Sequence, residues 1–187
     1  MRYGDLTELP PGLPVPQDDG AATHLPGMRL PPVTLPATDG SAVALADLAG
    51  RVVVFCYPRT GRPGDPPLVD EWDLIPGARG CTPQSCAFRD LDAEFRALEV
   101  RVFGLSAQGA AYQKEAAERL HLPFPLLSDA RLEFAEAMRL PTFGAGGETL
   151  LKRLTLTAHD GRIEKVFYPV FPPDKNADEV LTWLRRH

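Results

Sequence analysis

The chain has 187 residues and a formal net charge of −5 at pH 7, with no block of basic residues. This length predicts one domain with a sizeable core, and the charge argues against nucleic acid and anionic membranes as partners. No apolar run reaches the ~18 residues that a membrane-spanning helix needs. The polar, proline-rich N-terminus lacks the apolar core of a signal peptide, so we expect a cytoplasmic protein.

Residues 1–25 are predicted to be a proline-rich arm, either packed on the domain or partly disordered, in front of a domain over 26–187. A short hairpin is expected over 32–35 and 43–45. Residues 52–57 form a continuous apolar run, which is typical of a strand buried on both faces. The proline-rich segment 59–79 is a long insertion. A loop of this length is usually functional or mobile, and a packed surface insertion is the alternative.

Alternating helices and strands follow. We expect helices over about 83–98, from a Ser106 cap to about 120, from an Asp129 cap to about 138, and over 177–186. We expect strands over 100–105, 123–127, 150–157 and 163–168, the last two joined by a hairpin turn at 159–161. The glycines of 144–147 are predicted to form a flexible connection, since a phosphate-binding loop would follow a clear strand. This order predicts an α/β protein with a mixed sheet between helices, as in thioredoxin-like folds.

Chemistry is predicted for the segment 80–90, which holds Cys81 and Cys86. Pro83 is tolerated only in the first turn of a helix, so the helix must begin near Thr82 and Cys81 must lie at its N-terminus. Free N–H groups and the helix dipole at that end stabilise a thiolate and acidify the thiol. Two close cysteines in a reducing compartment are catalytic, redox-active or metal-binding, or they are ordinary small core residues. No histidine has zinc-ligand spacing with a cysteine, and Cys56 is expected in the core.

The spacing of the two cysteines has a mechanical consequence. Residues five apart on a helix are separated by ~7.5 Å along the axis and rotated by ~140°, so their Cα atoms are roughly 8–9 Å apart. A disulfide needs Cα atoms within ~7 Å. We therefore expect that a bond between Cys81 and Cys86 requires the first turns of the helix to unwind, which Pro83 and the preceding glycines make easier.

Tyr57-Pro58, followed by Gly80-Cys81-Thr82-x-Gln84-x-Cys86-x-Phe88-Arg89-Asp90, resembles the bacterioferritin comigratory protein (Q-type) group of peroxiredoxins. Weaker matches at 102–106, 122–129, 152–156 and 160–163 follow in the right order, so the resemblance covers roughly 30–187. It implies a thioredoxin-like fold and an atypical two-cysteine thiol peroxidase that reduces hydrogen peroxide and organic hydroperoxides without metal, flavin or haem. The implied partners are the peroxide and thioredoxin or a similar dithiol, and we expect a monomer or weak homodimer.

The resemblance also assigns roles to individual residues. Cys81 would be the peroxidatic cysteine and Cys86 the resolving one, joined in an intramolecular disulfide. Arg153 would be the active-site arginine beside the thiolate, and Pro58 would shield the pocket. The family usually has a threonine three residues before the peroxidatic cysteine, where this chain has Ala78. Thr60, at the start of the insertion, is the candidate to supply that hydroxyl.

A second register and two other functions stay open. Pro76-Gly77-Ala78 followed by Thr82-Pro83 and Cys86 resembles another peroxiredoxin branch, in which Cys86 would attack. We rank it second, because the first register fits without gaps. A thiol–disulfide oxidoreductase is an alternative, although its usual Cys-x-x-Cys is absent. A redox sensor or binding module could use the same cysteine switch.

Overall fold

The computed structural model describes residues 5–187, and its centre is a mixed five-stranded sheet in the order β5-β4-β3-β8-β9. Strands β3 (Arg51–Cys56), β4 (Val100–Ser106) and β5 (Leu126–Ser128) are parallel. Strands β8 (Leu154–His159) and β9 (Arg162–Phe167) form the predicted hairpin, and β8 runs antiparallel to β3. Residues 52–56 of the central strand are all buried, as their apolar run predicted.

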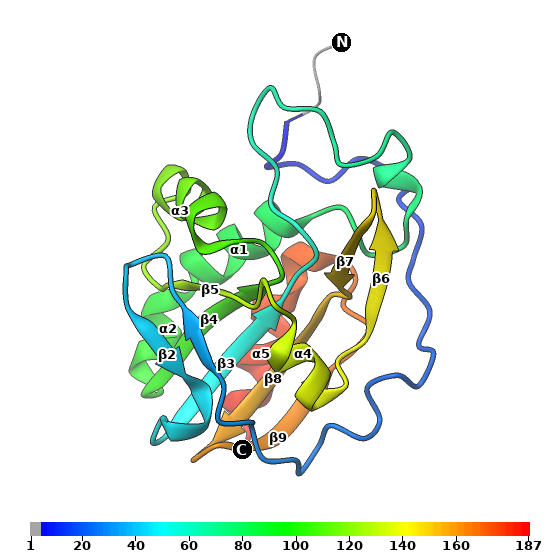
Figure 1. Cartoon of the computed structure of the whole chain (residues 1–187). Helices are drawn as coiled ribbons and strands as arrows, with labels where there is room; N and C mark the ends of the chain where they lie inside the picture. The colour runs from blue at the N-terminus through cyan, green and yellow to red at the C-terminus, as the bar shows by residue number, and fades with distance from the viewer. Residues whose placement is uncertain (1–4) are drawn as a thin grey trace.

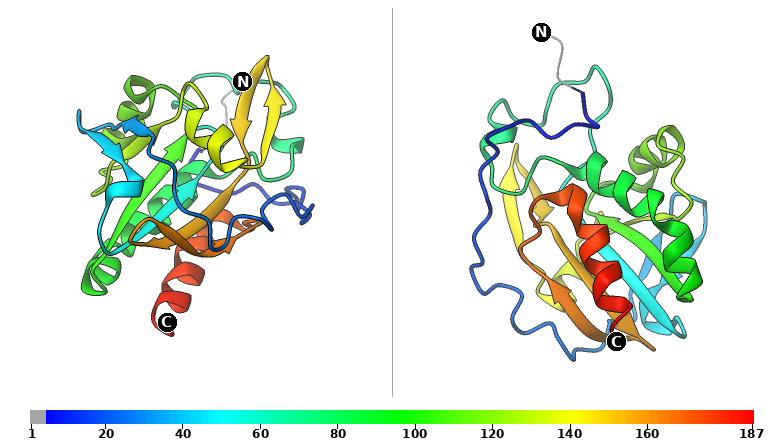
Figure 2. Two further views of the ribbon diagram at one scale, coloured as in Figure 1. Left: turned by 60° about the horizontal axis from the view of Figure 1, so that its bottom comes forward. Right: turned by 180° about the vertical axis from the view of Figure 1, so that it is seen from behind.

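Helices and a hairpin cover the two faces of this sheet (Figures 1 and 2). One face carries α1 (Cys81–Asp90), α2 (Asp92–Ala97) and α5 (Asn176–Leu184), whose apolar side chains pack on the sheet in one core cluster. The other face carries α4 (Glu133–Met138) and the hairpin of β1 (Thr34–Pro36) and β2 (Ala42–Ala44). Helix α3 (Ala110–Arg119) packs beside β5. The described residues also form three short 3-10 helices: η1 (Leu45–Asp47), η2 (Trp72–Leu74) and η3 (Pro173–Lys175).

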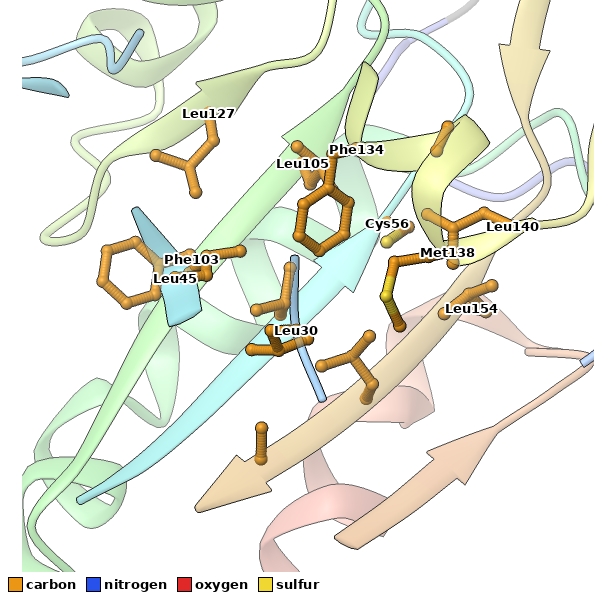
Figure 3. Close-up of a cluster of buried hydrophobic side chains, with 14 of the residues drawn as sticks. Leu30, Leu45, Cys56, Phe103, Leu105, Leu127, Phe134, Met138, Leu140 and Leu154 are labelled. Atoms are coloured by element: carbon orange, nitrogen blue, oxygen red, sulfur yellow. The ribbon is translucent and has the colours of Figure 1, made fainter. Parts of the chain in front are cut away.

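Cys56 lies in the core, as expected. Figure 3 shows its sulfur beside Phe134 and Met138 of α4, with Leu154 of β8 nearby. The residue is fully buried, and burial raises the pKa of its thiol, with the nearby Asp129 carboxylate adding to the shift. A thiol that is kept neutral and away from solvent is inert, so Cys56 has a packing role.

Two helix predictions need correction. The helix expected over about 83–98 is divided at Leu91, whose φ of −104° and ψ of 9° separate α1 from α2. Ser106 does not cap α3. It is the last residue of β4, its hydroxyl donates to the Pro58 carbonyl at 3.2 Å, and α3 begins at Ala110 after Gly109. For α4, which begins at Glu133 after an N-cap position at Leu132, the carboxylate of Asp129 accepts the N–H groups of Phe134 and Ala135, so its side chain caps the helix from outside the N-cap position.

The flexible connection expected at 144–147 is also wrong. Strands β6 (Thr142–Ala145) and β7 (Glu148–Leu151) form a hairpin there, and Gly146 and Gly147 are its two turn residues with φ of 56° and 78°. A two-residue turn with positive φ at both positions matches the twist of antiparallel strands, which is why two glycines favour it. The strand expected over 150–157 is consequently divided into β7 and β8 by Lys152 and Arg153.

The insertion 59–79 is irregular apart from η2, and it packs against the β6–β7 hairpin. Trp72 is buried and contacts Phe143 of β6 with ring centroids 6.4 Å apart. The N-terminal arm from residue 5 onward runs extended along the molecule (Figure 2), and residues 1–4 lie outside the described part. Asp19 fixes the arm to the domain by an ion pair with Lys152 at 2.7 Å and a hydrogen bond from Tyr168 at 2.8 Å. No helix within residues 5–187 is long and apolar enough to cross a membrane.

Candidate active site

Cys81 is the first residue of α1, and the backbone before it requires glycine. Gly80 has a φ of 106°, in the region that side chains disfavour. A Cβ at this position would lie 2.4 Å from Cγ of Pro173 and 2.9 Å from Cδ2 of Leu9. The last turn before Cys81 is thus closely covered by η3 on one side and the N-terminal arm on the other.

The start of α1 presents free backbone N–H groups beside Cys81. The helical hydrogen-bond ladder begins with the N–H of Gln84, which donates to the Gly80 carbonyl at 3.1 Å. Pro83 has no N–H, and the N–H groups of Cys81 and Thr82 precede the ladder. These groups and the helix dipole favour negative charge at this end of the helix. The helix start predicted from Pro83 is therefore confirmed to within one residue.

Arg153 lies directly against the cysteine sulfur. Its Nη2 is 3.1 Å from Cys81 Sγ, and only 3% of the residue is exposed. The same nitrogen donates to the carbonyls of Ala78 at 3.1 Å and Arg79 at 3.2 Å, and Nε donates to the carbonyl of Gly77 at 3.2 Å. One guanidinium therefore fixes the loop before α1 and places a permanent positive charge beside the sulfur, where it stabilises an anion.

Gln84 holds this arginine and is itself held through Asn176 and Thr155, three residues for which the sequence predicted no role in the site. Arg153 Nη1 donates to Oε1 of Gln84, which is fully buried. Gln84 Nε2 in turn donates to Oδ1 of Asn176 at 3.0 Å, and the hydroxyl of Thr155 donates to the same oxygen at 2.6 Å. Because Gln84 Oε1 accepts from an arginine, its amide orientation is fixed. A buried polar network thus connects Cys81 through α1 to the start of α5.

Pro58 and Thr60 form part of a different buried group. The N–H and the hydroxyl of Thr60 donate to Oε1 of Gln108 at 2.8 and 3.1 Å, and Gln108 Nε2 donates back to the Thr60 carbonyl at 3.1 Å. The Pro58 carbonyl accepts the hydroxyl of Ser106. The structure therefore brings Cys81 and Arg153 together, whereas the Thr60 hydroxyl is engaged by Gln108. Among the described residues, neither Pro58 nor Thr60 lines the cavity at Cys81.

A cavity of about 490 Å³ opens beside Cys81. Residues 78–82 line it, most of the other lining residues belong to the insertion, and Leu6 of the arm and Tyr112 of α3 complete the lining. Ala78, at the position where the family usually has threonine, is fully buried and is one of the lining residues. The insertion thus forms the chamber that gives access to the sulfur.

Cys86 lies one and a half turns further along α1, where it is half-buried. Burial raises the pKa of its thiol, against the opposing charge of Arg89. It is not among the residues that line the cavity, and all three cysteines are free thiols. The environment of Cys81, beside an arginine and at a cavity wall, favours the first register over the second. Both cysteines belong to one unbroken helix in this reduced chain.

A mixed sheet between helices, with a buried cysteine starting the helix after the central strand, defines a thioredoxin-like thiol protein. A profile of the redoxin family matches residues 25–181. Peroxiredoxin Q, chloroplastic, of Oryza sativa subsp. japonica is 34% identical over 161 residues, covering 85% of this chain and 66% of the rice protein. Peroxiredoxin Bcp of Escherichia coli (strain K12) is 33% identical over 167 residues, covering 84% of this chain and 93% of Bcp.

The crystal structure of peroxidoxin BcpB from Mycobacterium tuberculosis superposes with a TM-score of 0.70 at 29% identity, covering 87% of this chain and 98% of BcpB. The chain belongs to the redoxin family and, within it, to the peroxiredoxins of the Q and Bcp group. The resemblance and the thioredoxin-like fold predicted from the sequence are therefore confirmed.

Proposed function

We propose that this chain is a thiol peroxidase that reduces hydrogen peroxide and organic hydroperoxides through Cys81. The observation that carries the proposal is the 3.1 Å contact between Arg153 Nη2 and Cys81 Sγ, at a helix N-terminus and on the wall of a cavity. Membership in the peroxiredoxins, which act on peroxides, supports it. Free N–H groups and a fixed cation are donors of the kind that stabilise charge developing in a transition state.

The first step is a displacement at oxygen. The Cys81 thiolate attacks the terminal oxygen of the hydroperoxide, an S–O bond forms and the O–O bond breaks. The electron pair leaves with the other oxygen as an alkoxide or hydroxide, which takes a proton from water. Cys81 is thereby oxidised by two electrons to a sulfenic acid. Arg153 stabilises negative charge both on the sulfur and on the leaving oxygen. The shielding role of Pro58 and the substrate-orienting role of Thr60 remain predictions.

The second step is resolution by Cys86 within the chain. The Cys86 thiolate attacks the sulfur of the sulfenic acid, an S–S bond forms, and the oxygen leaves as water with one added proton. Both cysteines lie in α1, so this bond requires the first turns of the helix to unwind. Unwinding breaks the hydrogen bonds of Gln84 to Arg153 and Asn176. Thioredoxin or a similar dithiol then returns two electrons by thiol–disulfide exchange.

We infer a cytoplasmic monomer or weak homodimer, without nucleic-acid or membrane partners. We also place the start of the catalytic domain after an arm over 1–25, with 59–79 as an insertion in the domain. The redoxin profile, which starts at residue 25, supports this boundary.

Consumption of peroxide with a thioredoxin system tests the proposal. The wild type is expected to turn over, Cys81→Ser to be inactive, and Cys86→Ser to complete one oxidation without recycling. Cysteine mapping by mass spectrometry after one equivalent of peroxide should find Cys81 linked to Cys86. Full turnover by Cys81→Ser together with inactive Cys86→Ser would establish the second register. Reduction of disulfides without consumption of peroxide would instead indicate a thiol–disulfide oxidoreductase. If the protein showed neither activity, the redox sensor would be the remaining function.

A further inference from the structure

The cavity beside Cys81 is far larger than hydrogen peroxide requires. Its volume of about 490 Å³ lies in the range of ~300–1,000 Å³ that is typical of sites for small organic molecules. Apolar side chains form much of its wall, including Leu6, Leu68 and Trp72, with Pro66 and Pro67 beside them. Such a wall suits the hydrocarbon body of an organic hydroperoxide, whose reactive end would face Cys81.

Three arginines line the same cavity, and two of them already have carboxylate partners. Arg59 Nη1 is 3.2 Å from Oε2 of Glu148, and Arg79 Nη1 is 3.7 Å from Oδ1 of Asp73. The third is Arg62. Within residues 5–187 it has no carboxylate partner within 4.0 Å, and its Nε is buried without any hydrogen-bond partner. A buried donor without an acceptor is rare in folded proteins and calls for an explanation, such as a functional role or a bound water or ion.

Arg62 is also held in a defined position. Its guanidinium carbon lies 4.1 Å from the centroid of the Tyr112 ring, so the cation stacks on the aromatic face. Arg59 stacks on the same ring at 5.1 Å. Tyr112 belongs to α3, so the stack attaches the insertion to the body of the fold. A planar guanidinium that stacks on a ring through its face can still donate from the N–H groups of its edge. Such an edge binds a carboxylate through two parallel hydrogen bonds.

Acidic residues of the cavity do not neutralise this site. Asp73 pairs with Arg79, and Asp65 and Asp70 are exposed, where water and salt screen their charges. We propose that Arg62 binds an anionic group, a carboxylate, on organic hydroperoxides whose hydroperoxyl end reacts at Cys81. Arg62 is then a specificity-determining residue of the insertion. This inference rests on the proposed peroxidase function, and it adds the class of substrate: amphipathic hydroperoxides with a negative charge distant from the O–O bond.

A matched pair of substrates tests the proposal. Cumene hydroperoxide carrying a para-carboxylate is compared with its neutral methyl ester, and hydrogen peroxide serves as the reference. The wild type is expected to prefer the carboxylate in kcat/KM by about tenfold or more, the factor of one charge-assisted hydrogen bond. Arg62→Gln should abolish that preference, measured as the ratio of kcat/KM for carboxylate and ester, and the loss should appear mainly in KM for the carboxylate. Arg131→Gln, which removes an exposed arginine outside the cavity, is the control for net charge.

Binding gives a second measurement that does not depend on turnover. 4-Isopropylbenzoate, which has no peroxide bond, should bind the wild type and bind Arg62→Gln about tenfold more weakly in calorimetry. Tyr112→Phe keeps the ring and should keep this affinity, whereas Tyr112→Leu should lose it. Equal rates with carboxylate and ester in the wild type, or a preference that survives in Arg62→Gln, would overturn the role of Arg62. If the wild type reduced neither hydrogen peroxide nor the ester, the peroxidase function itself would have failed.

Discussion

Replacement of Arg153 tests the reasoning about the site most directly. Arg153→Met removes the cation and every hydrogen-bond donor, and it puts an unbranched apolar side chain in their place. Arg153→Lys keeps the charge but loses the planar fork that reaches Cys81, Gln84 and three backbone carbonyls at once. The two variants thus separate the effect of charge from the effect of geometry.

The contacts of Arg153 determine how large the expected loss of rate is. A hydrogen bond to a charged group contributes ~1.5–3 kcal/mol, and each ~1.36 kcal/mol is a factor of ten in rate. Loss of the 3.1 Å contact with the sulfur should therefore lower the rate constant of Cys81 with hydrogen peroxide by about 10- to 150-fold. Arg153→Met also leaves three backbone carbonyls without their donor, so the rate constant of this variant should fall further than that of Arg153→Lys. The rate constant of Arg153→Lys should lie between those of Arg153→Met and the wild type.

Stopped-flow fluorescence can follow this reaction, because Trp72 lines the same cavity as Cys81. The reduced proteins are mixed with hydrogen peroxide under pseudo-first-order conditions, and circular dichroism checks that each variant is folded. A folded Arg153→Met variant that reacts at the wild-type rate would refute the assignment of Arg153. Equal rates for Arg153→Lys and Arg153→Met would show that the charge without the fork contributes nothing.

Two other outcomes follow from the geometry. Gly80→Ala places a methyl group 2.4 Å from Pro173 at a φ of 106°, so we expect a loss of about 1–3 kcal/mol in the free energy of unfolding; urea denaturation that matches the wild type would contradict this. The raised pKa of Cys86 means that less of its thiolate exists at neutral pH. The rate of disulfide formation after oxidation should therefore still increase as the pH rises above the ordinary thiol pKa of ~8.5, and rapid quench with mass analysis would measure it; a plateau below that pH would show a lowered pKa instead.

The sequence predicts correctly those features that depend on residues close together in the chain. Pro83 fixed the start of α1 and so placed Cys81 correctly, and the apolar run of 52–57 identified the central strand. The helix cap predicted at Ser106 is wrong because its hydroxyl donates to the carbonyl of Pro58, 48 residues away in the chain, and the sequence does not reveal this partner. The glycines at 146 and 147 suggested flexibility, since the turn conformation is apparent only once β6 and β7 are known to pair.

Residues of the site that come from distant parts of the chain were harder to predict. Arg153 is 72 residues from Cys81, and it was proposed only because the segment around it resembles a known family. Asn176 is 92 residues from Gln84, and no motif marks it. Arg62 lies in an insertion for which the family pattern offers no template. That it has no carboxylate partner within residues 5–187 is visible only in three dimensions.

The link between Gln84 and Asn176 bears on the reduction potential of the enzyme. Under the proposed mechanism the disulfide forms only after the first turns of α1 separate from α5, so the bonds of Gln84 stabilise the dithiol form alone. By linkage, each ~1.4 kcal/mol of such stabilisation raises the potential of a two-electron couple by ~30 mV. A polar contact between a redox helix and the C-terminal helix therefore makes the disulfide a stronger oxidant, and hence easier for a dithiol donor to reduce.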